Sequence, residues 1–195
     1  MYVRDAKNRE EVWLLDRIEE MGLDETAFRS RDYVVTIDEE SHEKAGFGRI
    51  RIHKPEDETE LCELTSIGVL DAWRGQGIGA HVVERLVEYA SDEGFETVYS
   101  LTGHPDYLQQ FGFERIDESQ LPEKLRERLE SKRETLEPDA VPTRIDTDDF
   151  RMPDEFRERF KSATAEEAGE GEPVEGPEDF GIDPEEATYK YDTGR

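Results

Sequence analysis

The sequence has a single cysteine, Cys62, among 195 residues, so it can form no internal disulfide and offers no cysteine cluster for zinc. It has no apolar run near the ~20 residues that cross a bilayer. Its first ten residues, MYVRDAKNRE, are charged and hold no apolar signal core. The four histidines are scattered without metal-ligand spacing. We therefore expect a soluble, cytoplasmic protein without a metal site, in which Cys62 is a small buried apolar side chain.

Lysine is scarce as well. It provides seven of the 25 basic residues, and arginine provides the other 18, against 51 acidic residues. The formal net charge is −26 at pH 7. A surface this acidic and this poor in lysine is typical of proteins that work at high salt, where screening weakens self-repulsion. We expect a halophilic origin and no nucleic-acid partner, since phosphate backbones bind basic faces.

The stretch from Glu60 to Tyr89 organises the chain. Its first part predicts a strand, because apolar and β-branched residues are frequent in ELTSIGVL. Its last part predicts a helix, because apolar residues recur at steps of three and four. Between them, residues 74–80 (RGQGIGA) place glycines at alternate positions where a helix begins. Such a turn lets a ligand approach the backbone at the positive end of the helix dipole, so it predicts a phosphate cradle with Arg74 beside it.

Four interpretations of this loop compete. A Walker A loop would need Lys and Ser/Thr, which do not follow Gly79. A dinucleotide-binding turn would space its glycines two and then three apart, whereas these are two and two apart. A glycine-rich turn without a ligand is the plainest alternative. The fourth is a resemblance: Arg-x-x-Gly-x-Gly-Ala at 74–80, after Ile67-x-Val69, resembles the acetyl-CoA motif of the GNAT acetyltransferases.

A second segment carries the same resemblance. Residues 107–113 (YLQQFGF) resemble the aromatic Gly-Phe ending of the family, and the match covers about three fifths of the chain. The segments GFETVYSLT and QLPEK resemble the short amino-acid N-acetyltransferases of the N-acetylglutamate synthase type. Two departures separate the chain from that group. Thr65 stands where those enzymes often carry Arg, and their cysteine pair is missing.

The resemblance implies a binding site for acetyl-CoA along the strand and the loop. The implied binding residues are Ile67, Val69, Arg74, Gly75, Gln76, Gly77, Ile78, Gly79 and Ala80. The Val69 N–H would donate to the thioester oxygen, an oxyanion-type contact.

The resemblance also implies catalytic residues for direct attack by an amine. Glu63 matches the strand glutamate of the family and is the predicted general base, with Glu60 as the fallback. Tyr107 is the predicted general acid, because the usual tyrosine position is occupied by Leu108. Water is the alternative acid.

The whole pattern predicts an α/β domain of GNAT type, with a mixed, mostly antiparallel central sheet flanked by helices. Predicted strands are 2–4, 31–38, 45–53, 60–70, 97–102 and 112–116. Along 45–53, alternate residues predict one face with Phe47, Arg49 and Arg51 and another with Gly48, Ile50 and Ile52. The first predicted helix is capped by Asp5 or Asn8 and runs to about Met21, with a stripe of Val12, Leu15, Ile18 and Met21 that Trp13 and Leu14 widen. Further predicted helices are 23–28, 81–90 and 106–111. The predicted division is an acetyltransferase domain (1–118), a helical C-terminal extension (119–168) and a disordered acidic tail (169–195). In the extension, 138–150 is predicted to be irregular and 152–168 helical, with Phe156 and Phe160.

The predicted function is therefore acetyl-CoA-dependent N-acetylation of a small-molecule primary amine such as an amino acid. Arg49 and Arg51 could meet an acidic acceptor, and pairing with nearby acids is the alternative. Two other functions remain open: an acetyl-CoA-binding regulatory module with weak catalysis, and a protein N-acetyltransferase. A homodimer is one assembly compatible with the sequence.

Overall fold

The computed structural model describes residues 1–56 and 58–165, so the predicted tail at 169–195 lies outside the described residues. Seven strands form one sheet in the order β1-β2-β3-β4-β5-β7-β6. Their bounds are β1 (Tyr2–Asp5), β2 (Tyr33–Ile37), β3 (Lys44–His53), β4 (Leu61–Val69), β5 (Thr97–Thr102), β6 (Glu114–Arg115) and β7 (Val141–Asp146). All neighbouring strands are antiparallel except β4 and β5. The predicted mixed, mostly antiparallel sheet is confirmed.

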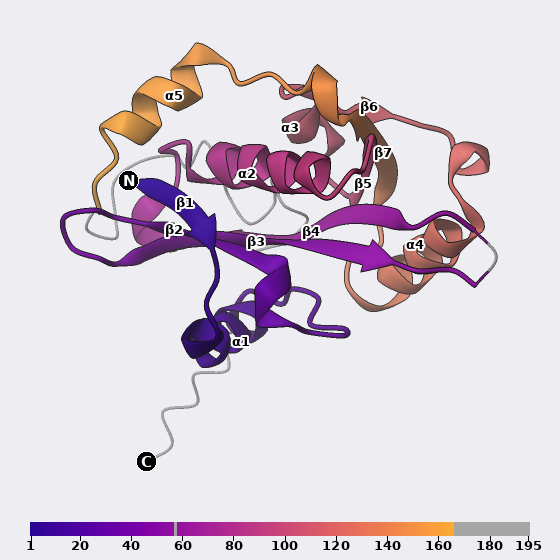
Figure 1. Cartoon of the computed structure of the whole chain (residues 1–195), viewed down its shortest axis with the longest axis horizontal. Coiled ribbons are helices and arrows are strands. Elements are labelled where there is room, and N and C mark those ends of the chain that lie inside the picture. The colour runs from indigo at the N-terminus through magenta and orange to yellow at the C-terminus, as the bar shows by residue number, and fades with distance from the viewer. Residues whose placement is uncertain (57, 166–195) are drawn as a thin grey trace.

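Helices cover both faces of this sheet (Figure 1). In the described part of the chain they are α1 (Glu11–Glu20), α2 (Ile78–Asp92), α3 (Pro105–Gln109), α4 (Glu123–Thr135) and α5 (Asp154–Lys161). The helices α2, α3 and α5 lie on one face, and α1 and α4 lie on the other. None of these described helices is both long and apolar enough to span a bilayer.

The face under α2 is apolar. Ile50 of β3 and Leu64 of β4 are register partners, and both are buried against the apolar stripe of α2. Gly48 lets the helix approach, because a Cβ at this position would lie 2.5 Å from a methyl carbon of Val82. The predicted alternation of the two faces along β3 is therefore confirmed.

The opposite face has two apolar clusters with a polar gap between them. At one end α1 packs Leu14 and Ile18 around Phe47, and at the other end α4 packs Leu125 and Leu129 with neighbouring apolar side chains. The strand residues between these clusters are charged and buried. This gap contains the candidate acceptor end of the site.

The first helix is confirmed, but Val12 and Leu15 of its predicted stripe lie outside the buried cluster. Val12 is 70% exposed, whereas Leu14 and Ile18 are fully buried. The buried stripe runs through Leu14 and Ile18, which are four residues apart, so Val12, two residues before Leu14, falls on the other side of the helix. The predicted helix at 23–28 is wrong. The Asp24 carboxylate accepts the Thr26 N–H at 2.9 Å, a local turn that competes with helix formation.

The segment predicted to be irregular contains a strand, β7, which lies between β5 and β6. Pro142 concealed it, because proline lacks the N–H that a central strand normally donates. Here the Pro142 carbonyl accepts the Ile116 N–H at 3.0 Å, and Pro142 is the register partner of Leu101. The predicted boundary at 118 therefore does not divide two packing units, because chain beyond it completes the central sheet.

Candidate active site

The predicted phosphate loop has a backbone that only glycine adopts readily. Gly75 and Gly77 have φ angles of 71° and 75°, in the left-handed region. Gly77 is also the N-cap of α2, so the first turn of the helix receives no capping group from its own N-cap side chain. The loop therefore presents backbone N–H groups at a positive helix end, as a phosphate cradle requires.

The side chains of this loop have intramolecular partners. Arg74 forms an ion pair with Asp71 at 2.7 Å, and its side chain is 20% exposed. Gln76 reaches the backbone of Thr164, far along the sequence. Ile78 and Ala80, predicted as binding residues, are fully buried in the first turn of α2. Their side chains are packed in the core, so a ligand would meet the backbone of the loop.

The two parallel strands part after a single register pair, Glu63 with Tyr99. On the side that faces β3, β4 has a bulge, because Arg49 pairs with Thr65 whereas Phe47 pairs with Gly68. Ser66 lies in this bulge and has a φ of 52°. The Leu70 N–H donates to Ala45 of β3, so the alternation of the strand turns the Val69 N–H toward the gap. This is the orientation that the predicted thioester contact needs.

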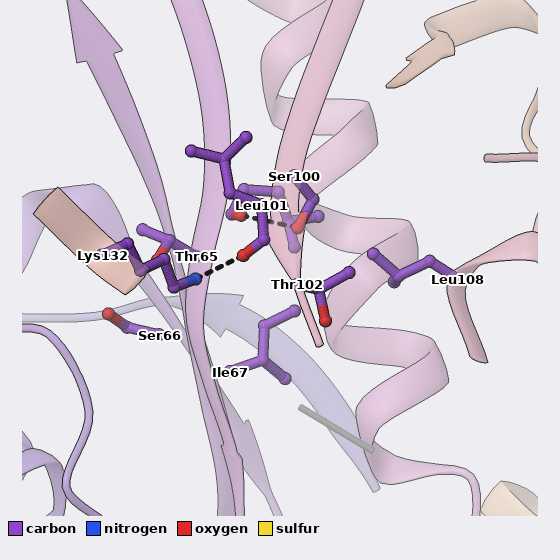
Figure 2. Close-up of a pocket in the computed structure, with 9 residues that line it drawn as sticks. Thr65, Ser66, Ile67, Ser100, Leu101, Thr102, Leu108 and Lys132 are labelled. Atoms are coloured by element: carbon purple, nitrogen blue, oxygen red, sulfur yellow. Dashed lines mark hydrogen bonds between the residues drawn. The ribbon is translucent and has the colours of Figure 1, made fainter. Parts of the chain in front are cut away.

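A pocket lies in the gap between the strands (Figure 2). Its lining residues are Leu64, Thr65, Ser66, Ile67, Ser100, Leu101, Thr102, Leu108 and Lys132. Ser100 donates to the Leu64 carbonyl at 3.1 Å, and Lys132 of α4 donates to the Leu101 carbonyl. These side chains satisfy carbonyl groups that would otherwise pair across the parted strands.

Glu63, the predicted base, precedes the pocket-lining Leu64 in β4 and is completely buried. Its Oε1 atom lies 2.9 Å from His53 Nε2 and 3.3 Å from Arg128 Nε. Burial would raise the pKa of Glu63, but the hydrogen bond with His53 and the charges of Arg128 and Lys132 outweigh it and lower the pKa to about 2. A carboxylate this well stabilised is a weak proton acceptor at neutral pH. Its contacts hold His53 and Arg128 in place, and its role as a general base stays a prediction.

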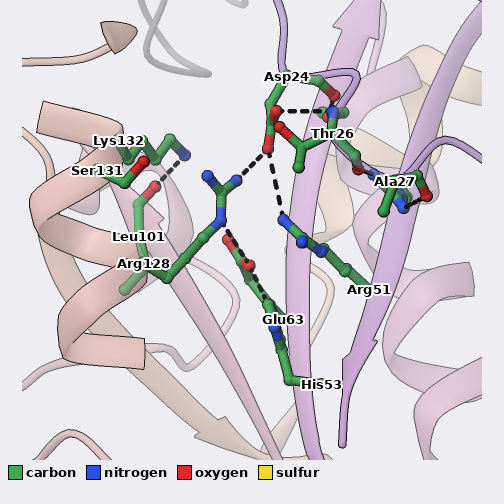
Figure 3. Close-up of polar contacts among 12 residues, drawn as sticks. Asp24, Thr26, Ala27, Arg51, His53, Glu63, Leu101, Arg128, Ser131 and Lys132 are labelled. Atoms are coloured by element: carbon green, nitrogen blue, oxygen red, sulfur yellow. Dashed lines mark hydrogen bonds and ion pairs between the residues drawn. The ribbon is translucent and has the colours of Figure 1, made fainter. Parts of the chain in front are cut away.

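Arg128 joins Glu63 to the loop after α1 (Figure 3). Its Nη2 atom donates to the Asp24 carboxylate, and the Arg128 side chain is 9% exposed. Burial would raise the pKa of Asp24, but hydrogen bonds from Thr26 and the charges of Arg128 and Arg51 lower it. Four segments distant in sequence thus build one buried ionic network.

Arg51 stands at the edge of this network. Its Nη1 atom lies 3.9 Å from Asp24 Oδ2 and makes no hydrogen bond within the described residues. The Arg51 side chain is 18% exposed. Burial, and the neighbouring charge of Arg128, lower its pKa. Arg49, in contrast, is 1% exposed and spends both Nη atoms on the carbonyls of Thr26 and Ala27, at 2.8 and 2.6 Å.

Tyr107, the predicted acid, does not line the pocket, whereas Leu108 does. The Tyr107 ring packs against Phe111 and Phe156, with centroids 5.2 and 6.4 Å away, in the cluster under α2. The fallback base, Glu60, pairs with Lys54 at 3.4 Å where both side chains are more than half exposed. Ile67 therefore lines the pocket, Glu63 lies in the ionic network beside it, and Tyr107 and Glu60 lie elsewhere.

Sequence reasoning missed Asp24, His53, Arg128 and Lys132. Arg128 and Lys132 lie four residues apart on α4, in a run that alternates charges as a solvated helix does. The sequence contained one clue. Arg128 comes one residue before the buried Leu129 and Lys132 comes three residues after it, so both lie at the edge of the buried leucine stripe. Asp24 carried the signal of a turn-forming residue, which gave no indication of a partner at position 128.

Comparison with known proteins relates these features to a family. The model of the acetyltransferase (GNAT) family matches residues 2–113, more than half of the chain. An uncharacterised N-acetyltransferase of Chlorobaculum tepidum is 32% identical over 66 residues, which is 34% of this chain and 43% of that protein. The chain therefore aligns with less than half of that relative.

Two solved structures share the fold. The N-acetylglutamate synthase of Neisseria gonorrhoeae, in complex with coenzyme A and N-acetyl-glutamate, has a TM-score of 0.59 and 17% identity, over 75% of this chain and 35% of that chain. A Mycobacterium tuberculosis protein in complex with CoA has a TM-score of 0.62 and 17% identity, over 75% of this chain and 99% of that chain. At this identity the likeness concerns the fold alone. The family match over residues 2–113 establishes that the chain belongs to the GNAT acetyltransferase family.

Proposed function

We propose that this protein is an acetyl-CoA-dependent N-acetyltransferase that acts on a small primary amine carrying a carboxylate, such as an amino acid. The observation that carries the proposal is the pocket between β4 and β5, lined by Lys132, in a fold that also holds the glycine loop after β4 and a buried network in which Arg51 keeps an unsatisfied donor within the described residues.

The loop and the parted strands fit acetyl-CoA. The backbone of the loop at the start of α2 would hold the pyrophosphate, and the Val69 N–H would face the thioester oxygen. Acetyl-CoA supplies an acetyl group activated as a thioester. The complexes of the Neisseria and Mycobacterium proteins with CoA support this choice of co-substrate.

The acceptor end favours a carboxylate. Positive side chains are gathered here in a protein of net charge −26. Glu63 and Asp24 both pair with Arg128, but Arg51 keeps a buried donor without a hydrogen-bond partner within the described residues. A carboxylate on the acceptor would satisfy that donor with a charge-assisted hydrogen bond.

In the reaction, the nitrogen lone pair of the neutral amine attacks the thioester carbon, the C–N bond forms and the C–S bond breaks. The amine loses one proton and the departing thiolate gains one. The Lys132 ammonium lines the pocket, so a second positive charge is disfavoured there and the acceptor amine loses its proton more readily. Glu63 holds Arg128 in place. For Tyr107 to serve as acid, its ring would have to leave the cluster with Phe111 and Phe156, so we propose water as the proton donor.

The test is an acceptor panel in molar KCl, chosen because we propose a halophilic origin. Free thiol is measured and the acetylated product is identified by mass. Each amino acid is paired with its amide, which keeps the amine and removes the carboxylate. We expect the amino acids to be preferred. Arg51→Met should raise their KM about tenfold to a hundredfold, the effect of losing one charged hydrogen bond, and hardly change the KM of the amides.

The matched control is Arg31→Met, since Arg31 is exposed on the surface. Equal KM values for amino acids and amides in the parent protein would contradict the carboxylate site. The second candidate function is a regulatory module that binds acetyl-CoA without turning it over. Leu108 favours it, because it puts an apolar group where the family has a hydroxyl. Binding without thiol release for any acceptor would support the module.

A further inference from the structure

The last described helix, α5, lies on the phosphate loop. A Cβ on Gly77 would lie 2.5 Å from the Phe156 carbonyl oxygen, so the open side of this glycine is occupied by the backbone of α5. Gln76 of the same loop donates to the Thr164 carbonyl at 2.7 Å and accepts the Thr164 N–H at 2.8 Å. The chain thus fastens its own C-terminal segment to the loop at two points.

Two further contacts hold α5 along the first half of α2. The rings of His81 and Phe160 are stacked with centroids 3.8 Å apart. Arg157 forms a bidentate ion pair with Glu84, at 3.0 and 2.6 Å. The segment lies outside residues 2–113, the part of the chain that matches the family model.

Phe156 connects the loop to α3. Its side chain is 1% exposed and lies 5.5 Å from the Phe111 ring and 6.4 Å from the Tyr107 ring, by centroids. Leu108 of the same helix lines the pocket, and Phe156 contacts both α3 and the phosphate loop.

We propose that α5 is an intramolecular plug on the phosphate end of the site, which acetyl-CoA displaces when it binds. The proposal rests on acetyl-CoA as the co-substrate of the proposed function. In this arrangement the loop has two alternating occupants, the backbone of Phe156 and the pyrophosphate. Binding of acetyl-CoA requires the undocked state, so the measured dissociation constant is the intrinsic constant divided by the undocked fraction.

Apart from the buried Phe156 ring, the contacts of the docked state are of a displaceable kind. The Arg159 Nη1 atom is buried and has no hydrogen-bond partner within the described residues, which costs free energy as long as α5 stays in place. The ion pair with Glu84 is close to the surface, where such pairs contribute little. Once released, a helix of eight residues is too short to persist alone, so the segment would unfold.

Limited digestion with trypsin tests the displacement on the unmodified chain. Arg157, Arg159 and Lys161 lie within α5, and a docked helix resists cleavage because the protease needs an extended backbone. We expect saturating CoA to speed cleavage after these three residues about tenfold or more, measured by peptide mass. Unchanged or slower cleavage with CoA bound would overturn the proposal, since α5 would then stay docked over the ligand.

A tether tests it in the opposite direction. In the variant Glu84→Cys/Arg157→Cys, a short bismaleimide joins α5 to α2, while Cys62 is fully buried and stays unlabelled. We expect the tethered protein to bind CoA at least about tenfold more weakly than the same variant capped with N-ethylmaleimide, by calorimetry. Equal affinity of the two forms overturns the plug and leaves the proposed function intact. If the untethered parent binds no CoA, both are overturned.

Discussion

The two faces of the central sheet are both buried, but by different chemistry. On the α2 face, Ile50 and Leu64 pack against an apolar stripe. On the other face of the same two strands, the register partners Arg51 and Glu63 lie beneath Asp24 and Arg128. Burial of apolar side chains stabilises the fold directly. Burial of ions requires desolvation, which their attraction repays only with good geometry.

This difference indicates that the apolar face mainly provides stability and the ionic face mainly provides function. An apolar α4 side of the sheet would give an equally good core without the desolvation cost. The ionic side instead places polar and charged groups next to the pocket between β4 and β5. Lys132 and Ser66 both line this pocket, and the Ser66 hydroxyl donates to the Asp24 carbonyl at 2.8 Å. We therefore expect changes on the ionic face to alter acceptor binding, and changes on the apolar face to alter stability alone.

The largest effect is expected from Arg128→Met. It removes one partner from two buried carboxylates, Glu63 and Asp24, and should lower the free energy of unfolding by about 3–5 kcal/mol. Urea unfolding in KCl measures this. Arg126→Met is the control, because Arg126 is exposed on the same helix. Equal stability of the two variants would mean that the ionic network contributes nothing to the fold.

Glu63→Gln should remove part of the pH dependence of the melting temperature. The pKa of Glu63 in the folded protein is about 2, below the value of 4.5 that the group has without these partners. Its stabilising contribution is therefore present above about pH 4.5 and is lost as the pH falls toward 2. We expect the melting temperatures of the parent and of Glu63→Gln to converge over this window. The exposed Glu60→Gln should follow the parent throughout, and a constant difference between the parent and Glu63→Gln would contradict the assignment.

The same variant separates positioning from general-base catalysis. If Glu63 positions Arg128, the acceptor KM should rise about tenfold and kcat should fall less. Loss of a general base would instead lower kcat about a hundredfold to ten-thousandfold, with recovery at high pH. The measurement is a full steady-state series at several pH values with one acceptor.

Lys132→Met should shift the pH profile of kcat/KM to higher pH. Without the ammonium in the pocket, the acceptor amine holds its proton more tightly, so the rising limb of kcat/KM should shift upward by about one pH unit. Lys124→Met, on the exposed side of α4, is the control. An unshifted profile would show that Lys132 does no more than satisfy the Leu101 carbonyl.

The smallest effect is expected on the apolar face. Ile50→Val, one residue before Arg51 and pointing the opposite way, should lower the free energy of unfolding by about 0.5–1.5 kcal/mol. It should leave the acceptor KM unchanged, which steady-state kinetics below the melting transition can check. A change in KM comparable with that of Arg51→Met would break the separation between the two faces.

The sequence by itself determined the features that depend on neighbours in the chain. The periodicity of α2, the alternation along β3, the glycines of residues 74–80 and the family they indicate are all local patterns. The order and mixed direction of most of the sheet followed from these elements, because hairpins and crossovers have few possible arrangements.

Only the tertiary structure decided which distant charges meet. The network residues come from four segments: Asp24, Arg51, Glu63 and Arg128. In the sequence, each of them looks like an ordinary solvated charge of an acidic chain. The tertiary structure also decided the place of β7, because its pairing is nonlocal and Pro142 obscures it in the sequence. It likewise decided that α5 packs on the loop at Gly77. The physical reason is that pairing across long loops depends on shape and on the satisfaction of buried polar groups, and neither leaves a periodic signal in the sequence.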